Sequence, residues 1–436
     1  MDDQRSTPDD TIRFRPIDRS QAVATPLDKL LPSDHPARLV VTFVDGLDFT
    51  PLYQAIKARL GQPGAPVFDP RLLFSLWLFA TVEGVASARR LERLCQRDLA
   101  FRWICGGVAP NYHTLSTFYA EHGDFLDATF IDILAALTER QLLTPKTIAI
   151  DGRKVTANAS KESFHREPTL QRHRQEAEQR VATLRQLRDK GGAAANQQRA
   201  AQKRAAEQRR QRLAEAVASV RQRQEERRQS GRSQPEEARA SSTDAEARKM
   251  KRSHGGFEPS FNVQTATDVS SGIIVAVVVT EQACDNGLLG PMVEKAQANT
   301  KTPVERSLAD AGYSDATDVE DLEKQGTAVY MPPKNEKKER QQGKDPYQPK
   351  RRDSKELAQW RQRMGTAAAQ ELYRLRAVVA EGVHAQQSNR GWKRFRLRGL
   401  VKAGMEALWQ AIAHNVCVLI AKKWLRTEGI LRPQLA

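Results

Sequence analysis

The stretch KTIAIDGRKVTANAS, residues 146–160, decides the fold of the larger, C-terminal part of this chain. Its segment 147–150 is a run of β-branched and small apolar residues, which predicts a buried strand. We expect this strand to end in a turn at Asp151-Gly152, because Asp and Gly favour turn conformations. The Asp151 carboxylate would then stand just past a strand end, where the side chains that perform chemistry lie in α/β folds.

Downstream of this strand, segments with the apolar spacing of strands alternate with segments that have the apolar spacing of helices. Two antiparallel strands are predicted over 261–266 and 273–280, joined by a turn at 268–272. Strands that then alternate with helices favour a mixed α/β sheet with helices on its faces. The further elements are expected in this order: a helix over 285–299, a strand over 304–309, a helix over 317–325, a strand over 327–331, a loop over 334–355, and helices from about 354 with a break near 389–391.

The residues before the first strand are helical in pattern. Residues 1–37 are polar with scattered prolines, which predicts a loose arm. Over 38–143, short apolar-periodic segments are separated by helix signals such as Asp69-Pro70 at a start and Gly106-Gly107 at an end. Short helices with basic exposed faces suit a DNA-binding domain of the helix-turn-helix type. A helical bundle that only packs would show the same pattern.

A basic insertion, residues 167–235, interrupts the part of the chain that carries the strands. Residues 171–230 contain 16 Lys and Arg against 7 Asp and Glu, and the insertion has no aromatic Phe, Trp or Tyr. Leu170, Ala177 and Leu184 are spaced by seven, and Gly191-Gly192 marks a break. This pattern predicts an antiparallel coiled-coil hairpin. Such an arm either lies along DNA or is a solvated insertion, and the pattern does not separate the two.

The composition of the whole chain narrows its partners and its compartment. The chain has 69 Lys and Arg against 53 Asp and Glu, and a net charge of +16 favours a polyanionic partner. Its four cysteines form no CxxC pair, which argues against a disulfide scaffold or a zinc ribbon and indicates a reducing compartment. The apolar run near 72–82 is shorter than the roughly 20 residues that span a bilayer. We therefore expect a soluble, cytoplasmic protein without a membrane partner.

Two further acids form a candidate metal site with Asp151. Asp310 follows the strand predicted over 304–309, and Glu381 lies on a predicted helix whose apolar flank indicates that it faces the sheet. Three converging carboxylates can hold two Mg²⁺ ions, because this cation takes oxygen ligands. Such ions activate a water or hydroxyl and stabilise the leaving oxygen of a phosphodiester. Each acid taken alone is equally consistent with a turn or a helix cap.

The segment that follows Glu381 is strongly basic. Residues 382–402 contain no acid, and Trp392 and Phe395 are interleaved with the cations. Basic side chains beside a metal site neutralise phosphates, whereas an ordinary basic helix would have the same composition. The candidate DNA contacts in this segment are Arg390, Lys393, Arg394, Arg396 and Arg398.

Five segments in a fixed order carry a resemblance to a known family. They are FDPRLLFSLWLFATVEGVASARRLERLCQRDLAFRWICGG with PNYHTLSTFY, IAIDGRKVTANAS, GGFEPSFNVQTATD, SLADAGYSD, and YRLRAVVAEGVHAQQSNRGWKRFRLRGLVKA. In this combination the chain resembles bacterial insertion-sequence transposases of the DDE type. The resemblance covers roughly residues 25–425, apart from the basic insertion.

The resemblance implies an RNase H-like catalytic domain over 144–430, interrupted by the basic insertion, with an all-α domain before it. The family's metal triad would map onto Asp151, Asp310 and Glu381. Enzymes of this family cut a strand at the terminal inverted repeats of an insertion sequence, and the freed 3′-hydroxyl then attacks target DNA. The implied cofactor is Mg²⁺, with Mn²⁺ as a substitute.

The family signature around the glutamate is only partly present. Tyr373 and Arg376 match the tyrosine and arginine that precede the glutamate, and Arg376 joins the candidate DNA contacts. Four residues separate Arg376 from Glu381, and Ser388 stands where many relatives carry a lysine. Arg390 or Lys393 is the candidate substitute for that lysine.

The implied partners are double-stranded DNA, as transposon ends and as target, and a second copy of the chain. A homodimer is expected in the DNA complex because two ends must be paired. The expected location is the cytoplasm, in association with the nucleoid. Two other functions stay open: a catalytically silent, transposase-derived DNA-binding protein, and a nuclease of the same fold that hydrolyses DNA without joining it.

Overall fold

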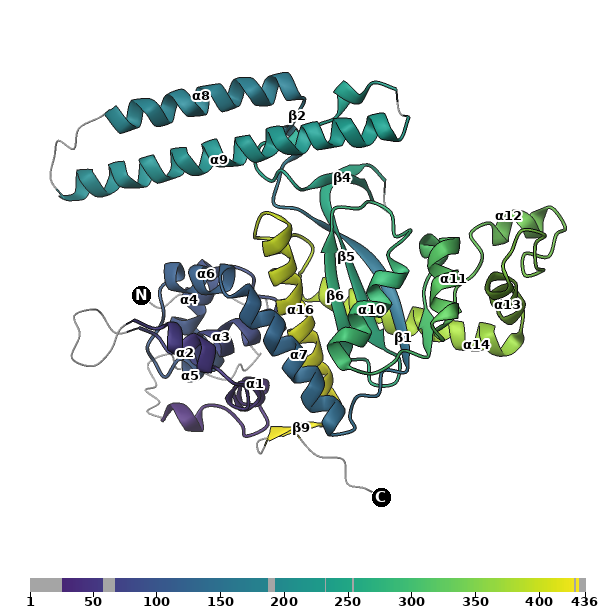
Figure 1. Cartoon of the computed structure of the whole chain (residues 1–436). Helices are drawn as coiled ribbons and strands as arrows, with labels where there is room; N and C mark the ends of the chain where they lie inside the picture. Colours follow the sequence, from purple (N-terminus) through teal and green to yellow (C-terminus); the bar gives the residue numbers. More distant parts are fainter. Residues whose placement is uncertain are drawn as a thin grey trace, which may run out of the picture.

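The computed structural model describes residues 26–57, 67–186, 193–231, 233–252, 255–426 and 429–430. Most of the predicted arm and the turn predicted at Gly191-Gly192 lie outside these residues. Figure 1 shows a group of N-terminal helices, a twisted sheet flanked by helices, and a pair of long helices that extends away from the sheet.

The sheet is mixed and is built around the first predicted strand. That strand, β1 (Thr147–Thr156), pairs antiparallel with β5 (Phe257–Asp268) and parallel with β7 (Arg306–Leu308). β7 pairs parallel with β8 (Ala328–Tyr330), so the strand order is β4-β5-β1-β7-β8, with β6 also paired to β5. The mixed α/β sheet predicted from the sequence is therefore confirmed. The two remaining strands of the sheet are β4 (Arg248–Lys251) and β6 (Ile274–Thr280).

The turn predicted at Asp151-Gly152 is wrong, because β1 continues through it. Gly152 pairs with Gln264 and Thr156 with Ser260 in an unbroken antiparallel register. An ideal Cβ on Gly152 would lie 2.5 Å from the Asp285 Oδ1 atom and closer still to Gln264. Gly152 therefore marks a close approach of neighbouring side chains. A glycine in that role and a glycine in a turn look alike in the sequence.

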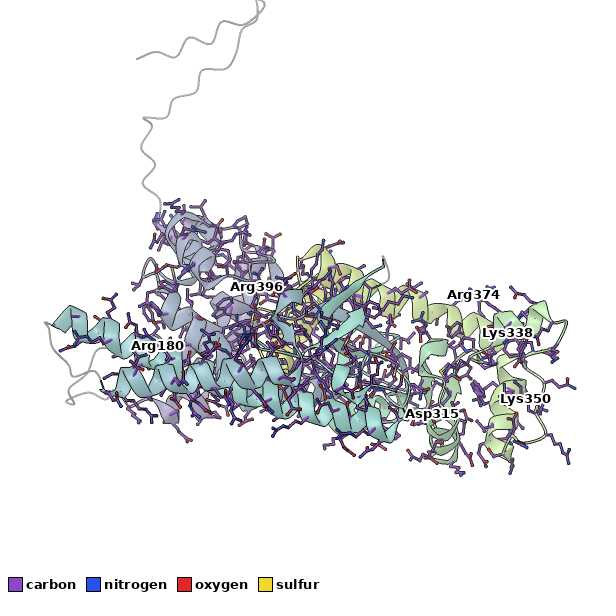
Figure 2. All side chains as sticks on the ribbon, turned by 90° about the horizontal axis from the view of Figure 1, so that it is seen from above. Arg180, Asp315, Lys338, Lys350, Arg374 and Arg396 are labelled. Carbon is purple, nitrogen blue, oxygen red and sulfur yellow. The ribbon has the colours of Figure 1, made fainter. Side chains whose placement is uncertain are left out.

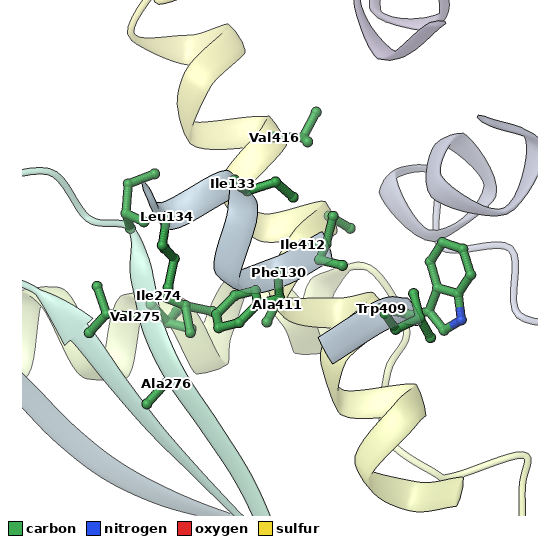
Figure 3. Close-up of a cluster of buried hydrophobic side chains, with 14 of the residues drawn as sticks. Phe130, Ile133, Leu134, Ile274, Val275, Ala276, Trp409, Ala411, Ile412 and Val416 are labelled. Carbon is green, nitrogen blue, oxygen red and sulfur yellow. The ribbon is translucent and has the colours of Figure 1, made fainter. Parts of the chain in front are cut away.

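Helices cover both faces of the sheet, because successive residues of β1 point to opposite sides. Ile148 and Ile150 belong to the main core, which α7, α10 and α16 cover, whereas Ala149 packs with Leu308 and Ala380 on the other side. Figure 3 shows the main core where Phe130 of α7 meets β6 and α16. The bounds of these helices are α7 (Gly123–Glu139), α10 (Leu289–Thr300) and α16 (Leu400–Ala421).

The N-terminal helices share this core instead of standing apart from it. Trp409 of α16 lies 4.7 Å from the ring of Phe74 and stacks on Tyr119 at 5.7 Å, measured between ring centroids. The helical pattern predicted here is confirmed, and the first helix begins at Pro36, just inside the predicted arm. The helices are α1 (Pro36–Asp45), α2 (Thr50–Ala55), α3 (Pro70–Val82), α4 (Ala88–Arg97), α5 (Leu99–Ile104) and α6 (Tyr112–Ala120).

The C-terminal helix α16 is the one helix, among the described residues, that is long and apolar enough to cross a membrane. Within the most apolar 18-residue window of this helix, 72% is buried inside the protein. Its side chains pack against α3, α7 and β6. Its apolar character is therefore that of a core helix.

The basic insertion forms two helices, α8 (Glu167–Gln186) and α9 (Ala193–Gln229), which run side by side in opposite directions (Figure 1). The predicted heptad positions Leu170, Ala177 and Leu184 are all buried. Leu170 and Ala177 pack with Leu213 and Val217 of α9. The helical hairpin therefore buries the apolar stripe that the spacing of seven predicted.

The segment 334–355, which was expected to be a loop, carries the short helix α12. The other predicted strands and helices are present with ends shifted by a few residues, as is usual at element boundaries. The remaining elements are β2 (Phe164–His165), β3 (Ala240–Ser241), α11 (Ala316–Lys324), α12 (Glu336–Gln341), α13 (Lys355–Met364), α14 (Ala367–Arg376), a π-helical turn η5 (Ala377–Glu381), α15 (Gly382–Asn389), β9 (Leu425–Arg426), β10 (Gly429–Ile430), and short 3₁₀ turns at Leu27–Lys29, Lys161–Ser163, Pro235–Glu237 and Ala311–Tyr313.

Candidate active site

Asp151 lies within β1 with a side chain that is only 14% exposed. Its Oδ1 atom accepts a hydrogen bond from the Gly152 amide at 3.0 Å, and the Arg376 Nη1 atom lies 3.5 Å from it. Burial raises the pKa of Asp151 to about 6, against the lowering effect of Arg376 and with a further rise from Asp310. The charge of this carboxylate is thus poorly solvated. Titratable groups with shifted pKa values of this kind are frequent in functional sites.

Asp310 comes to the same edge of the sheet as Asp151 because their strands are parallel neighbours. Ala149 pairs with Leu308, so each acid lies two residues beyond a paired position. Asp310 caps the short 3₁₀ turn that follows, and its Oδ1 atom accepts a hydrogen bond from the Gly312 amide at 2.7 Å. The strands that precede the two acids are therefore paired neighbours in the sheet.

Glu381 is tied to this pair through Arg376 and does not face the sheet as expected. Its carboxylate is 62% exposed, and its Oε1 atom lies 3.4 Å from the Arg376 Nη2 atom. The residue that packs against the sheet is Ala380, which is 1% exposed. Glu381 ends the π-helical turn η5, and such a turn accommodates one extra residue in a helix. That turn runs from Ala377 to Glu381, directly after Arg376.

The three predicted acids therefore share one region without closing into a single ligand set. In the described part of the chain, no three His, Cys, Asp or Glu side chains lie close enough together to hold one metal ion. Arg376, with a side chain only 12% exposed, lies between Asp151 and Glu381 and contacts both carboxylates. The candidate metal ligands in this region are carboxylate oxygens, which suit Mg²⁺ and Mn²⁺.

A further acid, Asp285, was not predicted from the sequence. Its Oδ1 atom accepts hydrogen bonds from the side-chain amides of Asn262 and Gln264, each at 2.7 Å. Its carboxylate lies beside both Gly152, which follows Asp151, and Gly312, which follows Asp310 by two positions. The helix predicted over 285–299 begins only at Leu289, so Asp285 belongs to the loop before α10. An acid just before a helix is usually a cap, which is why its position in the chain carried no signal of a site.

His384 is a second residue that sequence reasoning missed. It follows Glu381 by one helical turn on α15, and its Nε2 atom lies 3.7 Å from the Asp151 Oδ2 atom. Burial and, to a smaller extent, the charge of Arg153 lower the pKa of His384 to about 3, so its ring is neutral. Neither ring nitrogen has a hydrogen-bond partner in the described residues. The signal in the sequence that could have pointed to His384 is its position three residues after Glu381 on a predicted helix, because residues three apart share one helix face.

Two family descriptions match this chain. The description "Transposase domain (DUF772)" matches residues 25–121, and "Transposase DDE domain" matches residues 235–416. Residues 25–121 and 235–416 are therefore transposase domains, the second of the DDE type. The second match includes Asp310 and Glu381, whereas Asp151 and the α8–α9 pair lie between the two matched regions. No curated protein and no solved structure matches the chain. A DDE domain implies an RNase H-like fold, and the mixed sheet flanked by helices agrees with it.

The candidate DNA contacts of the basic segment, residues 390–398, lie between two helices. α15 ends at Asn389 and α16 begins at Leu400, so the interpretation of these cations as part of an ordinary helix is wrong. The segment instead runs beside β1: the Thr156 amide donates to the Lys393 carbonyl at 3.2 Å, and the Phe395 amide donates to the Thr156 carbonyl at 2.8 Å. Pairing with the free edge of β1 places this backbone next to the strand that carries Asp151.

Glu406 of α16 holds the far end of the same segment. Its carboxylate accepts hydrogen bonds from the Arg396 amide at 2.8 Å, the Leu397 amide at 3.2 Å and the Trp392 indole at 3.2 Å. Burial raises the pKa of Glu406 to about 7. With the backbone fixed in this way, the side chains of Lys393, Arg394, Arg396 and Arg398 stay exposed.

Proposed function

We propose that this chain catalyses metal-dependent cleavage and strand transfer of DNA at the terminal inverted repeats of an insertion sequence. The proposal is supported chiefly by one observation: Asp151 and Asp310 stand on neighbouring parallel strands, and Arg376 links Asp151 to Glu381. A DDE transposase needs carboxylates at this edge of its sheet, and the family match provides the reaction class.

Asp151, Asp310 and Glu381 would hold Mg²⁺, or Mn²⁺ in its place. When bound, such a cation supplies an activated water or hydroxyl and neutralises the leaving oxygen of a phosphodiester. Arg376 keeps its positive charge at any working pH, so it holds Asp151 and Glu381 near each other against their mutual repulsion. The neutral imidazole of His384 beside Asp151 adds no competing charge to the site.

The proposed partner is double-stranded DNA, both as transposon ends and as target. The side chains proposed to contact its phosphates are Arg376, Arg390, Lys393, Arg394, Arg396 and Arg398. We further propose that the helical domain over 38–143 binds DNA, that α8 and α9 form an antiparallel coiled coil whose basic face lies along DNA, and that two copies pair two ends as a homodimer. These events would take place in the cytoplasm, at the nucleoid.

The test is a cleavage assay on labelled DNA that carries the ends flanking the coding region. With Mg²⁺ or Mn²⁺, the full chain should nick these ends, and Asp151→Asn, Asp310→Asn and Glu381→Gln should each abolish nicking. Asp132→Asn, at an exposed position on α7, is the matched control and should cut normally. Cleavage that persists in Asp151→Asn would remove the assignment.

A second assay separates joining from hydrolysis. A pre-cut end with a free 3′-hydroxyl is supplied together with a target plasmid, and joined products are counted. A transposase joins the two molecules, whereas a nuclease of the same fold only degrades them. DNA binding that EDTA leaves unchanged, without cleavage under any divalent ion, would identify the chain as a silent DNA-binding relative.

A further inference from the structure

A groove with a volume of about 730 Å³ opens beside Asp151, along the outer part of β1. We call it the β1 groove. It begins at Gly152, the residue next to Asp151, and is bordered by Asp285 there and by Lys251 and Arg252 at the other end. Lys154 lies between these ends and pairs with Asn262, two positions along the strand from Gly152. The groove therefore follows one strand of the sheet outward from the candidate active site.

The walls of the β1 groove carry an excess of positive charge. Arg153, Lys154, Lys251, Arg252 and Lys393 line it, against the single acid Asp285. Arg252 forms an ion pair with Glu258 at 3.6 Å. Within the described ranges, the other four cations have no acidic side chain in ion-pair contact. Only Lys393 of these five belongs to the basic segment predicted from the sequence, so the tertiary structure adds four cations to it.

Arg153 is the most informative of these cations. Its guanidinium donates to the backbone carbonyls of His384 at 3.2 Å and Trp392 at 3.0 Å, and to the Ser388 hydroxyl. All three acceptors are neutral, and its Nε atom has no partner in the part of the chain that the structure describes. A largely buried cation without a carboxylate is costly unless an anion arrives to pair with it. Arg153 also lines the β1 groove, together with further cations.

We propose that the β1 groove binds the sugar–phosphate backbone of one DNA strand as it runs outward from Asp151, with Lys154, Lys251 and Arg252 on its phosphates. This inference rests on the proposed function, because it assumes that the scissile phosphate lies at Asp151. A continuous DNA strand fits the groove better than an isolated phosphate does. The cations line the groove from Arg153, next to Gly152, to Lys251 at the other end, and are not gathered at one point. Lys and Arg contacts of this kind fix the position of the strand without reading its sequence.

The first experiment measures how DNA affinity depends on salt, with full-length protein and a labelled duplex that carries the element's end. The double variant Lys154→Gln/Lys251→Gln should reduce the slope of log affinity against log salt by about 2, because each phosphate contact contributes about 0.9. Lys154→Arg/Lys251→Arg keeps both charges and should retain the slope. The control is Lys337→Gln/Lys338→Gln on α12, which lies at the opposite end of the molecule from the tip of the α8–α9 pair (Figure 2).

The second experiment is a lysine footprint on unmodified protein. Acetylation of Lys154 and Lys251 by a soluble acylating reagent is followed by mass spectrometry, with and without DNA. The inference predicts protection of both lysines and none of Lys337 or Lys338. Equal protection by inorganic phosphate would assign the groove to small anions and overturn the proposal.

The outcomes separate this inference from the proposed function. If the wild-type protein binds and cuts DNA while the double variant keeps the full salt slope and neither lysine is protected, the groove assignment fails and the function stands. If the wild-type protein neither binds nor cuts DNA, both fail together. An Asp151→Asn variant that binds with the full slope but does not cut would support both.

Discussion

Replacing Asp151 with Asn should stabilise the protein while it abolishes cleavage. Burial raises the pKa of Asp151 from the usual 3.8 to about 6, so the folded protein holds this proton more tightly than the unfolded chain does. The stabilising effect of that proton is present at low pH and is lost as the pH rises from about 4 to about 6. At neutral pH the ionised carboxylate therefore destabilises the folded state, and a neutral amide removes this cost.

The magnitude follows from the size of the shift. A shift of 6 − 3.8, or about 2.2 pKa units, corresponds to about 3 kcal/mol at about 1.4 kcal/mol per unit. The side chain is only 14% exposed, so solvent screens little of this energy. For 436 residues, an unfolding entropy of about 2.1 cal/mol/K per residue converts 3 kcal/mol into a rise of about 3 °C in the melting temperature.

The assay is thermal unfolding of the wild-type and Asp151→Asn proteins in EDTA, at several pH values between 4 and 7.5. The difference in melting temperature should grow as the pH rises to about 6 and then stay constant. The exposed variant Asp132→Asn should show no such trend. A variant that melts at or below the wild-type temperature at pH 7.5 would refute the argument that burial leaves this carboxylate poorly solvated.

Further predictions test the groups around Asp151. Gly152→Ala should cost about 1–3 kcal/mol in thermal unfolding, because its Cβ would displace Asp285; Gly404→Ala, a helix position with nothing within 4 Å of its Cβ, should instead stabilise by up to about 1 kcal/mol. Arg376→Lys should slow cleavage at least about tenfold, a loss of about 1.4 kcal/mol, because one ammonium cannot contact both Asp151 and Glu381; an unchanged rate constant would show that the bridge plays no part. Glu406→Gln should expose residues 393–398 to trypsin, because Glu406 Oε2 accepts both backbone amides and Oε1 accepts the Trp392 indole, and the amide nitrogen that replaces one oxygen cannot accept; the digestion pattern, read by mass spectrometry, decides it.

The sequence by itself determined the elements whose signals are local. The β-branched run at 147–150 is a buried strand, the acid after the strand at 306–308 stands at a sheet edge, and the apolar spacing of seven in 170–184 is a buried helical stripe. Each of these follows from side-chain periodicity or from the chemistry of a few neighbouring residues, which the chain carries wherever it folds.

Only the tertiary structure decided the details of the site. β1 continues past Asp151 because Gly152 leaves room for Gln264 of β5 and for Asp285 of the loop before α10. Glu381 is exposed and Ala380 is buried because a π-helical turn shifts the helix face there. The basic segment is extended because the edge of β1 offers it hydrogen bonds. In each case the deciding contact joins residues far apart along the chain, and the local pattern of either partner carries no record of the other.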